Sequence, residues 1–149
     1  MGKESVLLRC GTCNAVNRVP TERLGERPIC GKCKTLLSLP RTPVDATQAS
    51  FQREVFDWPG LVLVEFWSRS CGYCRLYEPV MDDLANRRAG RMKVVKVEVN
   101  EEPALSSRFN VHATPTFILF RNGQALGRLD GAPKEKIELV MWIDKISQP

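Results

Sequence analysis

The sequence predicts an α/β protein with a central mixed β-sheet flanked by helices and a small cysteine-rich segment before it. An apolar run over residues 61–67 leads through a short turn into a Cys-x-x-Cys sequence that opens a helical pattern. Strand and helix patterns then alternate to the end of the chain, with one strong hairpin signal. Four further cysteines precede a proline-containing linker. We therefore expect two domains, residues 1–40 and 41–149.

Composition and charge indicate a cytoplasmic protein whose positive charge is confined to its N-terminal segment. The chain has 149 residues and a formal net charge of +5, and residues 1–41 carry this excess because the remainder is balanced. No apolar run approaches the ~18 residues of a membrane span. The N-terminus lacks a long apolar core and a small-residue cleavage site, so we expect a cytoplasmic protein without a membrane partner.

The six cysteines form three Cys-x-x-Cys pairs. The first two pairs, Cys10/Cys13 and Cys30/Cys33, are separated by sixteen residues. This spacing is typical of a structural four-cysteine zinc site, in which the protein fills all four coordination positions. A segment this short needs a metal for stability, and we expect one Zn²⁺ ion and no organic cofactor. Two disulfides or two further redox pairs are the alternative.

The third pair, Cys71 and Cys74, follows a predicted strand and begins a predicted helix. Unpaired backbone N–H groups and the helix dipole favour a thiolate at the first cysteine. A thiolate attacks disulfides, and a second thiol three residues later can resolve the mixed disulfide. Half of a metal site or two buried core thiols would be the alternative reading.

The other elements follow from apolar periodicity and turn signals. We expect a helix through Phe51 and Val55 with Thr47 as its N-cap, and buried strands at 61–67 and 92–99. The active-site helix spans about 72–89, contains Pro79 and ends at Gly90. A short helix at 101–109, a strand at 116–120 and an antiparallel strand at 125–129 follow, the last two joined by Asn122-Gly123.

The last helix is expected to place Ile137, Val140 and Met141 on one face. A second apolar stripe on this helix includes Leu139, Trp142, Ile143 and Ile146. It is assigned either to ordinary burial, with Trp142 partly exposed, or to contact with the zinc segment or a partner.

Several separated motifs resemble thioredoxin over roughly residues 42–149. They are Phe66-Trp67, Cys71-Gly72-x-Cys74, Pro79, Ala113-Thr114-Pro115-Thr116, Asn122-Gly123 and Gly131-Ala132. The whole chain resembles the bacterial thioredoxins of the thioredoxin 2 type, which carry an N-terminal zinc ribbon. Asn17-Arg18-Val19-Pro20, after the first cysteine pair, matches that ribbon.

The resemblance implies a thioredoxin fold and a thiol–disulfide oxidoreductase. Cys71 would attack, Cys74 would resolve, and Pro115 would be a cis proline packed against the pair. The backbone at Thr114 would pair with an extended substrate segment. The residues implied to contact substrate are Trp67, Gly72, Tyr73, Thr114 and Gly131.

Glu65 lies in an apolar strand six positions before Cys71. Burial would raise its pKa into the range useful for taking the proton of Cys74. The family usually has Asp here, with a lysine nearby that matches Lys96. Glu65 would otherwise extend to solvent or pair with Lys96. His112, the only histidine, is expected to be a solvated loop residue or to add positive charge near Cys71 at low pH.

The active-site sequence departs from the family's usual Trp-Cys-Gly-Pro-Cys-Lys at Ser70 and Tyr73. Tyr73 restores an N–H that proline lacks, which should stabilise the Cys71 thiolate and give a potential between ~−270 and ~−180 mV. The first hypothesis is a monomeric protein-disulfide reductase, with disulfide-containing proteins as substrates and an NADPH-linked thioredoxin reductase as its reductant.

Two other functions remain open at this stage. The first is a disulfide isomerase or oxidant, and the second is a redox-sensing or binding module built on the zinc ribbon. The basic N-terminal segment favours the second, but it has no aromatic residue for base stacking, so no nucleic-acid partner is expected.

Overall fold

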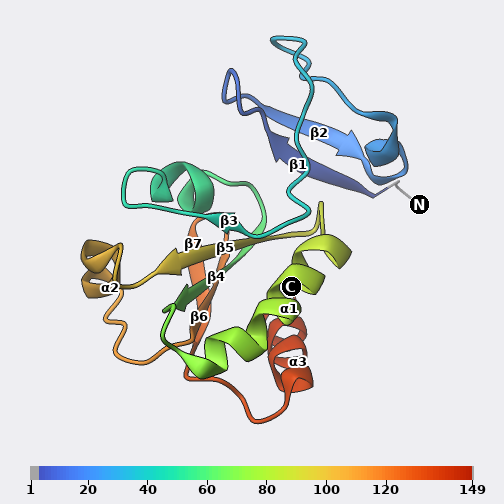
Figure 1. Ribbon diagram of the computed structural model, residues 1–149. Helices are drawn as coiled ribbons and strands as arrows, with labels where there is room; N and C mark the ends of the chain where they lie inside the picture. The colour runs from blue at the N-terminus through green and yellow to red at the C-terminus, as the bar shows by residue number, and fades with distance from the viewer. Residues whose placement is uncertain (1–3, 149) are drawn as a thin grey trace.

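The computed structural model describes residues 4–148, which form two separate β-sheets (Figure 1). The smaller sheet is an antiparallel hairpin of β1 (Ser5–Arg9) and β2 (Val16–Pro20). A 3₁₀ helix, η1 (Thr21–Glu26), follows directly. We call residues 4–39 the ribbon.

The larger sheet has five strands in the order β3-β5-β4-β6-β7. Its strands are β3 (Val44–Asp45), β4 (Leu61–Trp67), β5 (Met92–Glu98), β6 (Thr116–Arg121) and β7 (Gln124–Asp130). β3 and β4 run parallel to β5, whereas β6 is antiparallel to both β4 and β7. The predicted mixed sheet is therefore confirmed.

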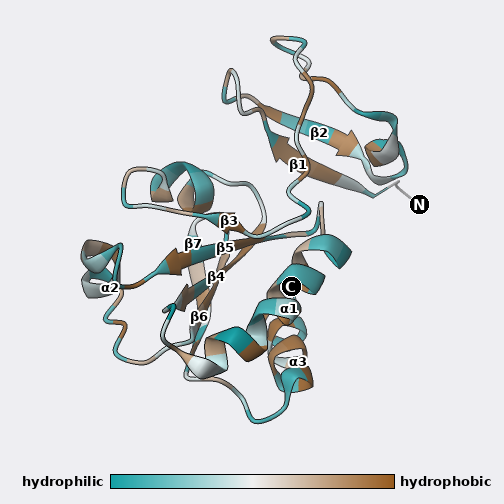
Figure 2. Ribbon diagram, viewed as in Figure 1, coloured by the Kyte–Doolittle hydropathy of each residue, from teal (hydrophilic) through white to brown (hydrophobic). Residues whose placement is uncertain are grey.

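Helices cover both faces of this sheet, as predicted (Figure 1). The π-helical segment η2 (Gln52–Phe56) and α2 (Pro103–Arg108) pack on one face. The helices α1 (Gly72–Arg87) and α3 (Lys136–Ile146) pack on the other. Much of β4 and β5 is brown in Figure 2, because alternate residues of these two strands enter two different apolar cores.

Two positive-φ residues form the predicted hairpin between β6 and β7. Asn122 has φ 49° and Gly123 has φ 81°, the combination of a type I′ turn. A Cβ on Gly123 would lie 2.9 Å from the backbone oxygen of Phe56. This turn therefore requires glycine for its conformation and for the close approach of η2.

The helix α3 buries the second of its two apolar stripes. Ile137 and Met141 on α3 are exposed, whereas Leu139 and Ile143 are fully buried against α1 and the sheet. Trp142 packs partly buried beside them. The second apolar stripe thus serves ordinary burial in this sheet's core and does not contact the ribbon.

Four elements, the strands β1, β2 and β3 and the 3₁₀ helix η1, were not predicted. The β1–β2 hairpin and η1 lie in a segment whose few large apolar side chains gave no clear period. β3 has only two residues and follows the linker. The helix expected from Thr47 begins later, although the Thr47 hydroxyl still accepts a hydrogen bond from Ser50 N at 3.2 Å.

Trp58 joins the ribbon to the large sheet. It packs against the core of the ribbon and against the core under η2. The Nζ of the buried Lys93 lies 3.9 Å from the Trp58 ring centroid and 2.5 Å from Glu54 Oε2.

The ribbon also contacts the loop before β4, where Arg9 Nε donates to Asp57 O at 2.6 Å. Gly60, Met92 and Asn122 line the cavity beside Trp58, so the ribbon contacts the end of the sheet where β4 and β5 begin.

Candidate active site and metal centre

Cys71 lies at the opposite end of β4, where the chain turns into α1. Its backbone is extended (φ −87°, ψ 115°), and it is the N-cap residue of that helix. Its Sγ accepts a hydrogen bond from Cys74 N at 3.2 Å. An N-cap acceptor usually belongs to Ser, Thr, Asp or Asn, and here a sulfur takes that place.

The two thiols of this pair have opposite acidities. Partial burial opposes ionisation of Cys71, but the Cys74 thiol and the backbone N–H groups of Cys74 and Tyr73 bring its pKa below the usual value. Burial raises the pKa of Cys74 to about 12, and the adjacent Cys71 and Glu65 contribute in the same direction. Of the two thiols, Cys71 therefore loses its proton more readily than Cys74.

Glu65 is 1% exposed and belongs to the same face of the sheet as α1. Burial raises its pKa to about 7, although the charge of Lys96 acts against this. Within residues 4–148, Glu65 Oε2 has no hydrogen-bond partner. Lys96 is opposite Glu65 in the β4–β5 register, but its Nζ lies 4.3 Å from the Trp67 ring centroid. Glu65 thus neither reaches solvent nor forms a close ion pair with Lys96 in the described part of the chain.

The loop before β6 brings the residues around Pro115 to Cys71. The Thr114–Pro115 peptide bond is cis, which confirms that prediction. The Cys71 thiol donates to Thr114 O at 3.4 Å. Gly131, at φ 89°, donates its N–H to Pro115 O at 2.9 Å. Thr114 O therefore contacts Cys71, whereas Gly131 contacts the backbone of the adjacent Pro115.

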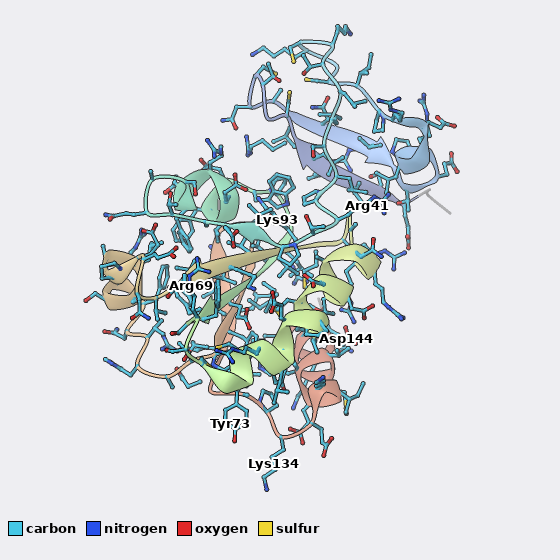
Figure 3. All side chains as sticks on the ribbon, in the orientation of Figure 1. Arg41, Arg69, Tyr73, Lys93, Lys134 and Asp144 are labelled. Atoms are coloured by element: carbon cyan, nitrogen blue, oxygen red, sulfur yellow. The ribbon has the colours of Figure 1, made fainter. Side chains whose placement is uncertain are left out.

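Tyr73 is 65% exposed and extends from the start of α1 at the end of the molecule remote from the ribbon (Figure 3). Gly72 is also exposed there, whereas Trp67 is half-buried between Lys96 and Arg69. His112 is an exposed residue of the loop between α2 and β6, as expected.

A polar network beneath the turn at 68–70 was not predicted. The buried Ser68 hydroxyl lies 3.0 Å from Ser70 Oγ and accepts a hydrogen bond from Asn100 Nδ2 at 3.2 Å. Asn100 N donates to Oε1 of the buried Glu98 at 2.7 Å. The sequence could have indicated this network, because Ser68 and Asn100 each follow a predicted strand. The carboxyl ends of adjacent parallel strands meet at one edge of a sheet, which brings such residues together.

The four N-terminal cysteines form one cluster in the ribbon. Their Sγ atoms all lie within 4.8 Å of one another. The distances Cys10–Cys33 and Cys13–Cys30 are both 3.6 Å. Tetrahedral coordination at a metal–sulfur distance of about 2.3 Å requires edges of about 3.8 Å, which these distances approach. The cluster therefore fits a metal ion, as the spacing predicted.

Backbone and side-chain donors surround these sulfurs. Thr12 N donates to Cys10 Sγ and Lys32 N donates to Cys30 Sγ, both at 3.4 Å. Backbone N–H contacts, chiefly from Cys13 to Cys10 and from Cys33 to Cys30, lower the pKa of Cys10 to about 5 and that of Cys30 to about 7. Asn17 Nδ2 also donates to Cys30 Sγ at 3.4 Å. Thiolates are the ligand form, so these donors favour metal binding.

A dithiol at a strand–helix junction, with two thiols of unequal acidity and a neighbouring cis proline, is the arrangement of a thiol–disulfide oxidoreductase. Family comparison supports this class. The thioredoxin model matches residues 42–145, and the model described as "Thioredoxin 2, N-terminal" matches residues 9–35. The chain therefore belongs to the thioredoxin family and carries the N-terminal zinc-ribbon module of thioredoxin 2.

Individual relatives agree with this assignment. Thioredoxin C-3 of Corynebacterium nephridii is 31% identical over 140 residues, which cover 94% of both chains. Thioredoxin 1 of a Nostoc species is 40% identical over 86 residues, covering 58% of this chain and 80% of its own. A solved mutant thioredoxin from Halobacterium salinarum aligns with a TM-score of 0.66 and 27% identity, covering 75% of this chain and 96% of its own. Among the described residues, every helix is too short or too polar to cross a membrane.

Glu65→Gln should stabilise the folded protein more at pH 8 than at pH 5. The pKa of Glu65 is about 7 in the folded state, against about 4.3 in an unfolded chain, so its contribution to stability is lost as pH rises between these values. Ionising it at pH 8 costs about 3 kcal/mol, which glutamine avoids. Urea unfolding at both pH values measures the difference, with exposed Asp82→Asn as the control. An equal effect of Glu65→Gln at both pH values would contradict the raised pKa.

Proposed function

We propose that this protein reduces disulfide bonds in other proteins through a Cys71/Cys74 cycle. The observation that carries this proposal is the asymmetry of the pair, with the pKa of Cys71 lowered at the helix start and that of Cys74 raised to about 12. An NADPH-linked thioredoxin reductase is the proposed source of the two electrons that return the pair to its dithiol form. The proposed setting is the cytoplasm, and the proposed state is a monomer.

In the first step, the Cys71 thiolate attacks one sulfur of the substrate disulfide. A Cys71–substrate mixed disulfide forms, the substrate S–S bond breaks, and one substrate sulfur leaves as a thiolate. The Thr114 carbonyl contacts this sulfur, and Gly131 N donates to O of the adjacent Pro115. The backbone of this loop would align an extended substrate segment. Trp67, Gly72 and Tyr73 are the other proposed substrate contacts.

In the second step, Cys74 attacks Cys71 Sγ and releases the second substrate thiolate. Cys74 must first lose its proton, and the ionised Cys71 is one cause of its high pKa. Formation of the mixed disulfide removes that negative charge, so the pKa of Cys74 falls at the moment when its thiolate is needed. We propose that Glu65 accepts the proton, because its carboxylate is buried and has a pKa of about 7.

The test of this function is the NADPH-dependent reduction of insulin in the presence of a bacterial thioredoxin reductase. The wild-type protein should support turnover, whereas Cys71→Ser should abolish it because no attacking thiolate remains. Cys74→Ser should accumulate the Cys71–insulin mixed disulfide, visible on a non-reducing gel. Glu65→Gln should turn over more slowly than the wild type. Turnover by Cys71→Ser would refute the assignment of the attacking sulfur.

A disulfide isomerase or oxidant is the second candidate, and one observation favours it. The Tyr73 N–H contributes to lowering the pKa of Cys71, which stabilises the reduced form of the pair. We propose a midpoint potential between ~−270 and ~−180 mV, above that of an ordinary thioredoxin.

Tyr73→Pro should lower this midpoint potential. Proline removes the N–H donor at Tyr73 and raises the pKa of Cys71, and one pKa unit corresponds to about 30 mV. Equilibration with a glutathione buffer measures the change, and Tyr73→Phe is the control because it keeps the N–H. A decrease of about 15–30 mV is expected for proline and no change for phenylalanine. An equal shift in both variants would assign the effect to the phenol.

For the N-terminal module, we propose residues 1–40 as a domain that holds one structural Zn²⁺ ion through Cys10, Cys13, Cys30 and Cys33. Residues 41–149 would form the catalytic domain. Oxidised sulfurs cannot hold zinc, so a redox-sensing role for the ribbon predicts that peroxide releases the ion.

Removal of zinc should unfold the ribbon and leave the large sheet folded. The ribbon has its own small core, which includes Cys10 and Cys30, whereas the two cores of the large sheet contain neither. Metal analysis should find one zinc per wild-type chain, less in Cys30→Ala, and one in Cys71→Ser. Amide NMR spectra after chelation under reducing conditions should lose dispersion for residues 4–39 alone. Loss across the whole chain would contradict independent folding.

A further inference from the structure

The ribbon carries a groove of about 530 Å³ that shares no lining residue with the cavity beside Trp58. β2, η1 and residues 26–31 form its walls. It therefore faces neither the large sheet nor Cys71, which lies at the other end of β4. A molecule in this groove would leave the sulfur pair free to react.

Three arginines and one glutamate give the groove a positive charge. Arg23 pairs with Glu26 at 2.8 Å, so these two charges compensate each other. Arg18 Nη1 donates to the neutral hydroxyl of Ser5 at 3.1 Å, which leaves its charge uncompensated. Arg27 is exposed and has no hydrogen-bond or ion-pair partner among the described residues. Two positive charges thus remain in the groove.

The backbone at Arg27 is in the left-handed region, with φ 55° and ψ 65°. Glycine adopts this conformation freely, whereas a residue with a Cβ does so at a free-energy cost. The Arg27 side chain makes no hydrogen bond or ion pair with the described residues that would offset this cost to the stability of the ribbon. Strained residues of this kind are characteristic of binding surfaces.

Apart from Asn17 and Gly31, the rest of the groove is aliphatic. Pro20, Pro28 and the buried Val19 line it, and Ile29 is 56% exposed at its edge. Ile29 pairs with Leu36, which is 53% exposed, so two apolar side chains stand side by side. The ribbon contains no aromatic residue on which a nucleic-acid base could stack. Positive charge beside aliphatic surface complements an acidic peptide that also carries aliphatic residues.

We propose that this groove docks an acidic, leucine-containing segment of a partner protein, with Arg18 and Arg27 as its charged contacts and Ile29 as its apolar contact. The segment's carboxylates would pair with the two free guanidinium groups. Such docking holds the partner without covering Cys71 and acts independently of the redox cycle. It also gives the basic ribbon a role other than stabilising its own fold.

The test uses fluorescence anisotropy with the zinc-loaded full chain and a labelled peptide of sequence Glu-Leu-Glu-Asp-Leu-Glu at low ionic strength. Arg27→Glu should weaken binding about tenfold, because it replaces an attraction with a repulsion. Arg27→Lys should retain most of the affinity. Arg41→Glu is the matched control, since Arg41 is exposed in the linker outside the groove (Figure 3), and it should change affinity little.

Two further peptides, one further variant and one activity assay complete the test. A peptide with serine in place of leucine should bind more weakly, and one with lysine in place of the acidic residues should not bind. Arg27→Gly should also lose affinity without lowering the urea midpoint, because glycine suits the backbone at this position. Insulin reduction by Arg27→Glu should equal that of the wild type. This comparison separates loss of docking from loss of the catalytic fold.

Three results would overturn the proposal. The first is no binding of the acidic peptide to the wild type. The second is an equal loss of affinity in Arg41→Glu and Arg27→Glu, which would reflect overall charge alone. The third is tighter binding of a single-stranded hexanucleotide than of the peptide, which would make the groove a nucleic-acid site.

Discussion

The hydrogen bond from Cys74 N to Cys71 Sγ is the contact on which the site depends. It places a sulfur where a helix normally has an oxygen acceptor, so the first turn of α1 and the reactive thiolate stabilise each other. The rest of the fold maintains this geometry. β4 ends at Trp67, Ser68 anchors the turn, and α1 begins at Gly72. A shift of a single residue in this turn would separate Cys71 from the helix end that lowers its pKa.

Glu65 shows how the sheet imposes a chemical role on one side chain. Its position in β4 fixes the face to which it points, and that face is covered by α1 and α3. A carboxyl group in such surroundings keeps its proton to a higher pH than in water, because burial disfavours the charged form and raises the pKa. The same burial that makes Glu65 unfavourable for stability gives it an acidity near neutral pH. A buried carboxyl group that lowers stability is expected at positions where the residue serves function and not packing.

The strands and helices with strong local signals were predictable. The apolar run of β4 and the Asn122-Gly123 turn depend on neighbouring residues in the sequence. The four-cysteine cluster was also predictable, because its spacing is itself the signal. The two-residue strand β3 and the hairpin of the ribbon had no such signal. Their pairing partners are chosen by tertiary contacts, which outweigh local propensity in short segments.

The orientation of α3 was ambiguous for a related reason. This helix is apolar on more than one side, and only contact with Leu63, Met81 and Phe117 decides that Leu139 and Ile143 are buried. The network at Ser68, Asn100 and Glu98 likewise combines residues from two strand ends that are far apart in the sequence. Periodicity can place each residue at its strand end, but a hydrogen bond between them follows only from the register of β4 with β5.

Lys93 clarifies how the ribbon and the large sheet are joined. An ammonium group that is 2% exposed needs a partner, and it has both the carboxylate of Glu54 and the face of Trp58. Trp58 also contacts the ribbon core, so the ribbon covers one side of a site that would otherwise expose this pair to water. Lys93 belongs to β5, so packing of the ribbon on Trp58 helps to keep water away from a charged residue of that strand. This contact lies at the start of β5, whereas Cys71 lies beyond the opposite end of the sheet. The metal centre and the dithiol are consequently held by one fold while their side chains make no direct contact.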